Sequence, residues 1–362
     1  MIRFTFIYGG IAAAVLIAGG LSHRVYPEAQ AAAQVQGDVA APRAFFGRRL
    51  EPSAPMVLEG AGQSDSESFL AFSAAVAPKR PLLFMSYVDL RDDLPAYFAR
   101  LRAQLQALPF FVVPQIGLSM NSGDAAKHYE ADVATGVDDA RLHAFCEGLR
   151  SLERPAFVRP GYEFNGPWNG YVPRTYAAAF RRIVTVTRAC RLQNVAFVWD
   201  LSAGAVLDQG ITPQQAIERW SEYYPGDAFV DWWGINLFGA RDLNAPTTTA
   251  FLNQAALHRF PVMIAESTSL HVPTVRGREA VDTWFAPYFA LIRRTPVIRA
   301  FCYIDWNWAQ YPQWSDWGDD RIERNAEVLS YVRGQLSQPW FAAARSRQET
   351  LKLLRAEPAA GR

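Results

Sequence analysis

Hydrophobic residues recur along the chain as short continuous runs, and amphipathic segments separate one run from the next. Continuous apolar runs are typical of parallel β-strands that are covered on both faces. Eight of them fit this pattern, at residues 56–59, 82–88, 110–116, 156–159, 195–200, 229–236, 262–265 and 300–304. Strand and helix patterns in alternation predict an α/β fold with a parallel sheet.

The segments between the runs carry helix signals. Apolar residues follow the helical period over residues 94–108 and 176–187, and more weakly over 328–336. Asp65, and Thr212 before a proline, are typical helix starts. Eight consecutive strand–helix units predict a (β/α)8 TIM barrel.

We expect this barrel to occupy residues 50–340, followed by a helical tail at 341–362. A doubly wound sheet is the alternative, and it calls for a glycine-rich phosphate loop after the first strand. Gly60-Ala-Gly62 is present there, but the third glycine of that motif is missing, which favours the barrel.

The N-terminus differs in kind from the rest of the chain. Arg3 precedes an apolar run at residues 4–21, whose length lies between that of a signal-peptide core and a short membrane anchor. We therefore predict a signal peptide or membrane anchor at 1–24 and a linker at 25–49. This predicts an extracytoplasmic protein, either periplasmic or secreted, with membrane attachment left open. The alternative is that the run forms a buried helix of the fold.

Composition excludes some classes of function. The formal net charge is +1 and no basic stripe stands out in the sequence, which argues against an electrostatic nucleic-acid binder. Cys146, Cys190 and Cys302 form no CxxC motif and are interpreted as small buried apolar residues. The five histidines form no HExxH motif, so we expect no metal site. The 11 Trp and 14 Tyr fit either a large core or a sugar-stacking cleft.

Two glutamates carry the candidate chemistry. Glu163 follows the fourth predicted strand and Glu266 ends the seventh, so both belong at the mouth of a barrel, on opposite sides. A carboxylate at such a place is costly to desolvate and needs a partner or a function. Two of them can divide glycosidic bond cleavage between a proton donor and a nucleophile. Alternatively, Glu163 only pairs with Arg159, and Glu266 only caps a helix.

Polar and aromatic residues surround both glutamates. Arg159 lies on the same strand as Glu163 and can keep a carboxylate ionised. Asp200 and Asp231 also come near strand ends, and we expect Asp231 to fix the sixth strand or a loop. The candidate substrate-binding residues are Arg159, Tyr162, Asn165, Trp168, Tyr171, Asn236 and Trp306.

Four segments together resemble glycoside hydrolase family 26, which belongs to clan A of retaining (β/α)8 glycosidases. Residues 159–168 look like the acid/base segment of that family, and 261–266 look like its nucleophile strand. Residues 223–234 are similar to its approach to strand six, and 303–306 to its strand-eight aromatic. The resemblance implies Glu163 as acid/base and Glu266 as nucleophile. It also implies cleavage of a β-linked glycan, commonly mannan, without a metal or organic cofactor.

Three positions depart from the family pattern. Tyr162 stands where the family usually has histidine, and Phe238 stands in the region where a tyrosine normally bonds to the nucleophile. The third strand, at 113–117, has no subsite histidine. The sequence thus predicts a retaining, endo-β-mannanase-like glycosidase acting on a polysaccharide as a monomer. A carbohydrate-binding pseudoenzyme attached to the membrane, or a transglycosylase in polysaccharide synthesis or export, is the alternative.

Overall fold

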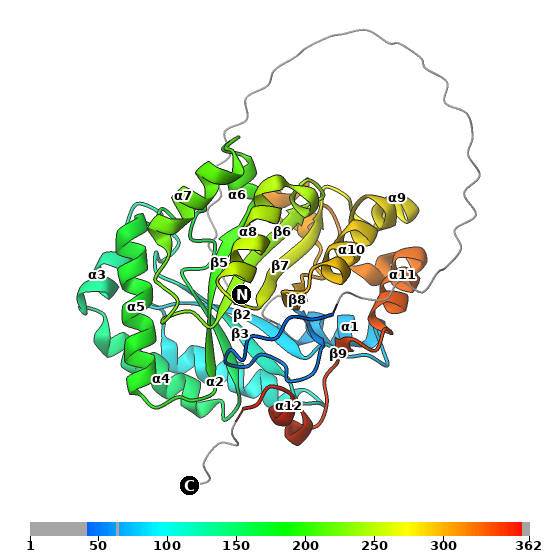
Figure 1. Ribbon diagram of the computed structural model, residues 1–362. Coiled ribbons are helices and arrows are strands. Elements are labelled where there is room, and N and C mark those ends of the chain that lie inside the picture. Colours follow the sequence, from blue (N-terminus) through cyan, green and yellow to red (C-terminus); the bar gives the residue numbers. More distant parts are fainter. Residues whose placement is uncertain (1–41, 63–64, 357–362) are drawn as a thin grey trace.

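The computed structural model describes residues 42–62 and 65–356 (Figure 1). The predicted signal peptide or anchor and most of the predicted linker lie outside the described residues. Within the described ranges, no helix combines the length and apolar character needed to cross a bilayer.

Eight parallel strands form a closed ring, because β1 pairs with both β8 and β2. The fold is therefore a TIM barrel, as predicted. All eight predicted strands are present, although the third and sixth begin three residues later than expected and the seventh continues past Glu266 to Leu270. The strands are β1 (Val57–Ala61), β2 (Leu83–Asp89), β3 (Val113–Ser119), β4 (Ala156–Pro160), β5 (Val195–Ser202), β6 (Trp232–Gly239), β7 (Val262–Leu270) and β8 (Ile298–Tyr303).

A short extra strand, β9 (Phe341–Ala342), pairs with β1. Two of the helices that cover the ring begin where the sequence predicts, since Asp65 caps α1 and Thr212 forms a capping box on α7. The α-helices are α1 (Ser66–Ala75), α2 (Leu94–Ala107), α3 (Glu130–Thr135), α4 (Asp139–Ser151), α5 (Pro173–Ala189), α6 (Ala203–Leu207), α7 (Pro213–Tyr223), α8 (Pro246–Leu257), α9 (Arg278–Ala280), α10 (Ala286–Arg294), α11 (Ala326–Leu336) and α12 (Arg347–Leu353).

Alternate residues of each strand serve two hydrophobic layers. On β1, Val57 and Ala61 belong to the layer between strands and helices, while Leu58 belongs to the layer inside the barrel. Both layers are buried, which explains why the strands are continuous apolar runs in the sequence. The candidate site lies at the carboxyl ends of the strands, above the inner layer.

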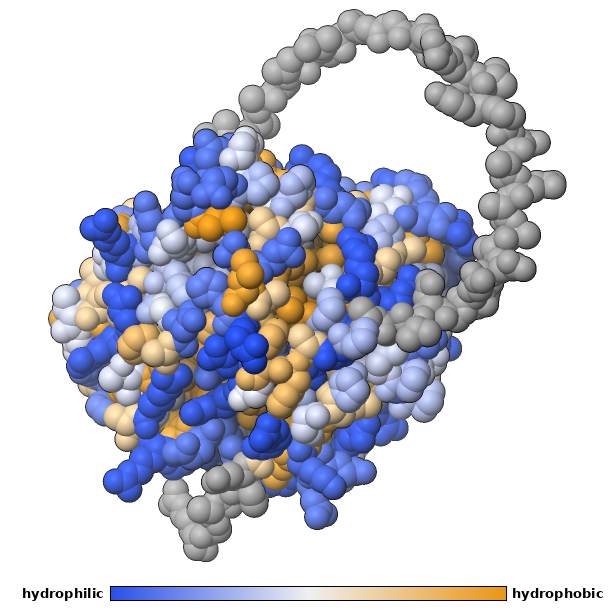
Figure 2. Space-filling view, viewed as in Figure 1, coloured by the Kyte–Doolittle hydropathy of each residue, from blue (hydrophilic) through white to orange (hydrophobic). Residues whose placement is uncertain are grey.

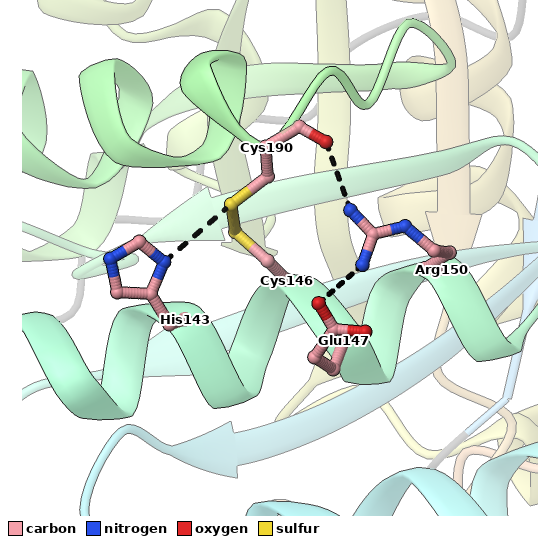
Figure 3. Close-up of a disulfide and its surroundings, with 5 residues drawn as sticks. All are labelled: His143, Cys146, Glu147, Arg150 and Cys190. Carbon is pink, nitrogen blue, oxygen red and sulfur yellow. Dashed lines mark hydrogen bonds and ion pairs between the residues drawn. A yellow bond between two sulfur atoms is a disulfide. The ribbon is translucent and has the colours of Figure 1, made fainter.

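The cysteine prediction is wrong for two of the three residues. Cys146 in α4 and Cys190, directly after α5, form a disulfide (Figure 3). Cys302 is unpaired and buried, as predicted. The two bonded cysteines are 44 positions apart and meet because α4 packs against α5. That packing is a tertiary contact, which no local spacing motif in the sequence could have indicated.

Candidate active site

Glu163 lies in a sharp turn directly after β4. Gly161 and Glu163 both have left-handed backbone, with φ of 57° and 51°. A Cβ at Gly161 would lie only 2.5 Å from the Tyr176 ring, so that position requires glycine. A glutamate in this conformation is strained, and strained residues concentrate at functional sites.

Two amide side chains hold the turn in place. Asn169 Nδ2 donates hydrogen bonds to the carbonyl oxygens of Tyr162 (2.9 Å) and Glu163 (3.0 Å). Asn165 exchanges two hydrogen bonds with the backbone of Ser202 on β5, at 2.9 and 2.8 Å. Both polar groups of the Asn165 amide are therefore engaged, so this predicted sugar-binding residue serves to fix the turn.

The Glu163 side chain is buried beside an aromatic donor. Trp168 Nε1 donates to Glu163 Oε2 at 2.9 Å, so Trp168 contacts the carboxyl group itself. Burial, followed by the negative charge of Glu266, raises the pKa of Glu163 to about 8. This environment favours a protonated Glu163 at neutral pH.

Glu266 has the opposite environment. Arg159 Nη1 lies 2.6 Å from Glu266 Oε1 and 2.7 Å from Asp200 Oδ2, and all three side chains are buried or nearly so. The shared guanidinium therefore makes a charge-assisted hydrogen bond to the Glu266 carboxylate. Arg159 therefore bridges two carboxylates, and Asp200 holds it from the β5 side.

Asn236 lies close to both glutamates. It pairs in register with Glu266 across the β6–β7 ladder and is fully buried. Its amide approaches the Glu163 carboxyl and counteracts part of the rise in the pKa of Glu163. A buried amide near both carboxyl groups is suited to hydrogen-bond a sugar hydroxyl.

Two tyrosine rings enclose Arg159. The Arg159 Cζ lies 5.5 Å from the centre of the Tyr87 ring and 5.0 Å from that of Tyr162. Tyr87, Gly117 and Arg159 stand opposite one another on β2, β3 and β4. A Cβ on Gly117 would lie 2.7 Å from one ring and 3.0 Å from the other, so glycine lets both rings close around the guanidinium.

Tyr87 was not predicted from the sequence. It lies inside an apolar strand, where a tyrosine is indistinguishable from a core residue. Gln115 on β3 was also missed, and its Nε2 donates to the Ala265 carbonyl at 2.9 Å, next to Glu266. This bond crosses the barrel interior and fixes the strand that carries Glu266.

The remaining predicted residues divide into two groups. Trp306 is half-buried, with its ring nearly parallel to Tyr311 at a centre distance of 6.4 Å. Trp317 lies beside Phe238, with 5.6 Å between the ring centres. We call these four rings, Trp306, Tyr311, Trp317 and Phe238, the aromatic wall. Tyr171 is different, because it is buried under the turn and its hydroxyl accepts a hydrogen bond from Met120 N.

Asp231 lies away from the candidate site. It precedes β6 and accepts a hydrogen bond from Phe197 N at 2.9 Å, so it links two strands at the amino end of the barrel. Among residues 42–62 and 65–356, no three His, Cys, Asp or Glu side chains are grouped so as to hold a metal ion.

No family model matches the chain. In sequence, it is 27% identical over 245 residues to a β-1,3-xylanase from an Alcaligenes species, covering 61% of this chain and 48% of the relative. It is 25% identical over 255 residues to β-1,3-xylanase TXYA from a Vibrio species, covering 62% of this chain and 52% of the relative. The chain thus spans about half the length of these curated relatives.

In structure, the chain is similar to a family 26 β-mannanase from Bacteroides ovatus. The TM-score is 0.56 at 12% sequence identity, and the match covers 80% of this chain and 90% of the mannanase. An endo-β-1,4-mannanase variant from Cellulomonas fimi gives a TM-score of 0.59 at 18% identity, over 84% of this chain and 78% of the other. The fold of this chain is therefore similar to that of solved family 26 mannanases, and its sequence is similar to that of β-1,3-xylanases.

Proposed function

We propose that this protein is a retaining glycoside hydrolase that cleaves a β-linked polysaccharide. One observation carries the proposal: two carboxyl groups at the barrel mouth have opposite environments. Burial and the charge of Glu266 favour the protonated form of Glu163, whereas Glu266 forms an ion pair with Arg159 at 2.6 Å. Two carboxyl groups in such different environments can supply an acid and a nucleophile at the same pH.

In the proposed mechanism, Glu163 donates its proton to the leaving glycosidic oxygen while Glu266 attacks the anomeric carbon. The bond to the leaving oxygen breaks and a glycosyl ester forms on Glu266. Glu163, now ionised, then removes a proton from a water molecule, which displaces Glu266 and restores both groups. Two such displacements retain the anomeric configuration.

Arg159 serves this mechanism as a positioning residue. It holds the Glu266 carboxylate through a hydrogen bond, and its bond to Asp200 fixes the direction of the guanidinium. Phe238 cannot donate the hydrogen bond to Glu266 that a tyrosine in this region would supply. Arg159 replaces it, because its guanidinium is a charge-assisted donor to Glu266 at 2.6 Å. Tyr87 and Tyr162 hold the guanidinium between them.

For the substrate, we propose a β-linked xylan or mannan backbone, with Asn236, Trp168 and Trp306 contacting the sugar at the cleavage point. The similar proteins named from sequence are β-1,3-xylanases, while those named from structure are mannanases. Because the sequence relatives share more identity with the chain, β-1,3-xylan is the first candidate to assay. The half-buried aromatic wall fits the apolar faces of either sugar.

We further propose that the protein acts outside the cytoplasm. The Cys146–Cys190 disulfide supports this, since structural disulfides persist in oxidising compartments. The apolar run at residues 4–21 is consistent with export.

Hydrolysis of a polymer panel tests the proposed activity. Wild-type protein is incubated with β-1,3-xylan, β-1,4-mannan and β-1,4-glucan, and the first product formed is followed by proton NMR. We expect the β-anomer to appear first, and strong loss of turnover in Glu163→Gln and Glu266→Gln. Glu59→Gln is the matched control, because Glu59 is equally buried but shares the outer side of β1 with Val57. Initial release of the α-anomer, or full turnover in Glu266→Gln, would contradict the proposal.

A further inference from the structure

The end of the barrel opposite the candidate site has a distinct chemistry. This end, which we call the basal face, consists of residues 42–56, the loops that lead into the strands, and the segment 343–356 with α12. Hydrogen bonds join these parts, from Ser53 N to the Leu353 carbonyl and from Ala344 N to the Arg80 carbonyl. In Figure 1, the dark blue start of the described chain and the red α12 both lie in the lower half of the view.

The basal face collects positive charge. Its segments contain more than twice as many arginine and lysine residues as acidic ones. Those that are exposed to solvent include Arg80, Arg191, Arg259, Arg347, Lys352 and Arg355.

The few acidic residues of this face are largely engaged. Glu51 is buried against Arg299, and Asp227 pairs with His258. Asp231 lies 3.7 Å from Arg188, and Glu349 caps the first turn of α12. The exposed arginines therefore retain most of their charge for a partner outside the molecule.

Because the net charge of the whole chain is only +1, this excess must be balanced elsewhere. Exposed acidic residues follow the carboxyl ends of the strands, among them Asp124, Asp208 and Asp316. The protein is thus electrically polarised along the barrel axis, with its basic end opposite the candidate active site. A polarised charge distribution orients a protein at a charged surface.

A cavity of about 500 Å³ opens at the edge of the basal face. Arg102, Arg154 and Arg347 line it, with Glu153 as the acidic residue among its lining side chains. Arg154 and Arg347 lie against the same Phe111 ring, at 4.8 and 5.8 Å. Their hydrogen bonds go to the carbonyls of Val112, Leu152 and Glu153, which fixes the guanidinium groups without neutralising them.

Apolar side chains are exposed among these charges. Phe45 is 47% exposed and Leu257, at the end of α8, is 73% exposed. The Arg355 guanidinium lies 5.6 Å from the Phe45 ring. On the side of the molecule seen in Figure 2, hydrophobic residues (orange) lie among hydrophilic ones (blue). Arginine mixed with exposed phenylalanine and leucine suits a bilayer interface better than a soluble polyanion.

We propose that the basal face docks on the surface of a membrane that contains anionic phospholipids, with the candidate active site facing away from the bilayer. The arginines contact lipid phosphates, while Phe45 and Leu257 enter the headgroup region. The chain order agrees, since the apolar run at 4–21 precedes residues 42–50, which lie on this face. Arg48 ties this segment to the loop between α8 and β7 through the carbonyls of His258 and Arg259.

Vesicle co-sedimentation tests the proposal on a protein that begins at residue 42. The ring of strands closes within the described residues, and circular dichroism verifies that this protein is folded. Vesicles of phosphatidylcholine alone are compared with vesicles containing 30% phosphatidylglycerol. We expect binding at least tenfold tighter to the anionic vesicles, weakening as salt is raised from 50 to 500 mM.

Three variants make the test specific. The quadruple change R80E/R191E/K352E/R355E should lower binding at least tenfold, because each basic residue near an anionic surface contributes to binding. K127E/R241E/R276E/R278E changes the net charge equally at the opposite end and should leave binding within about twofold. F45S/L257S should weaken binding to vesicles but not to alginate, a soluble acidic polysaccharide.

Other results would overturn the proposal. Equal binding to neutral and anionic vesicles, no sedimentation at 50 mM salt, or equal losses in both quadruple variants would each do so. Tighter binding to alginate or duplex DNA than to vesicles, unaffected by F45S/L257S, would indicate a soluble polyanion as the partner instead. Polysaccharide turnover does not enter these readouts, so the outcome is independent of the proposed hydrolase function.

Discussion

At the scale of single residues, the account depends on what surrounds each carboxyl group. Glu163 and Glu266 are the same residue type, and Glu163 follows β4 whereas Glu266 lies within β7. Arg159 donates a hydrogen bond to Glu266, as it does to Asp200, whereas Trp168 donates one to Glu163. The sequence could place both glutamates at the mouth and Arg159 near them, because strand ends define those positions. It could not assign Tyr87, because a tyrosine in an apolar strand has the same pattern whether or not it faces the site.

The raised pKa of Glu163 predicts a pH dependence. The proton that Glu163 donates is lost as pH rises through about 8, so kcat/KM on a polysaccharide should fall above that pH. An aryl glycoside whose leaving group needs no proton is the comparison. Its first step should show a much weaker alkaline fall in pre-steady-state measurements. The same alkaline fall for both substrates would contradict the assignment of Glu163 as acid.

Glu59 gives a second prediction, for stability. It is buried on the outer side of β1, and burial raises the pKa of its carboxyl to about 8, although Lys79 acts in the opposite direction. The folded protein therefore holds this proton more tightly than the unfolded chain does. Its contribution to stability is present below about pH 4.5 and is lost as pH rises through about 8.

The change Glu59→Gln should remove this dependence and raise the free energy of unfolding at pH 8.5 by on the order of a few kcal/mol relative to wild type. Urea unfolding between pH 5 and 8.5 measures it. Glu153→Gln, at an exposed position, is the control and should follow the wild-type curve. A pH dependence in Glu59→Gln that matches wild type would show that the carboxyl does not titrate in this range.

At the scale of elements, the eight strands were predictable because each is buried on both faces and is therefore a continuous apolar run. The starts of the third and sixth were predicted at residues 110 and 229, but the strands begin at Val113 and Trp232. Phe110 is apolar but belongs to the loop before its strand, where Arg80 covers its ring. Hydrophobicity alone does not separate a strand from an apolar loop. The Cys146–Cys190 disulfide was unpredictable because it depends on which helices pack together.

The row formed by Tyr87, Gly117 and Arg159 across three strands gives an element-scale prediction. Gly117→Ala adds a methyl group against both tyrosine rings and shifts them away from Arg159. We expect kcat/KM to fall by about tenfold to a hundredfold, since small displacements at a reacting centre are costly. Gly334→Ala in α11 is the control, because no atom lies within 4 Å of the added carbon.

Steady-state kinetics on both glycine variants measure the effect, and thermal unfolding shows whether each protein is folded. Gly334→Ala should keep wild-type activity. A folded Gly117→Ala protein with wild-type kcat/KM would show that the two rings do not position Arg159.

At the scale of the whole molecule, the barrel separates two kinds of surface. The carboxyl ends of the strands carry the glutamate pair and an aromatic wall, and the amino ends carry the basic basal face. The sequence indicated no basic stripe, because the residues of that face are scattered between positions 43 and 355. Only the closed fold, which brings every strand start to one end, gathers them. Loop lengths and substrate contacts could not be predicted from the sequence either, because they too depend on how the closed fold brings distant segments together.

The central claim is that Glu266 is the nucleophile, and chemical rescue tests it most directly. Glu266→Ala is incubated with aryl β-xylosides, β-mannosides and β-glucosides in the presence of sodium azide. We predict that azide restores release of the aryl group and forms an α-glycosyl azide, of inverted configuration, with the sugar that the enzyme prefers. Aryl release by Glu266→Ala at the wild-type rate without azide, or a β-glycosyl azide as product, would contradict the account.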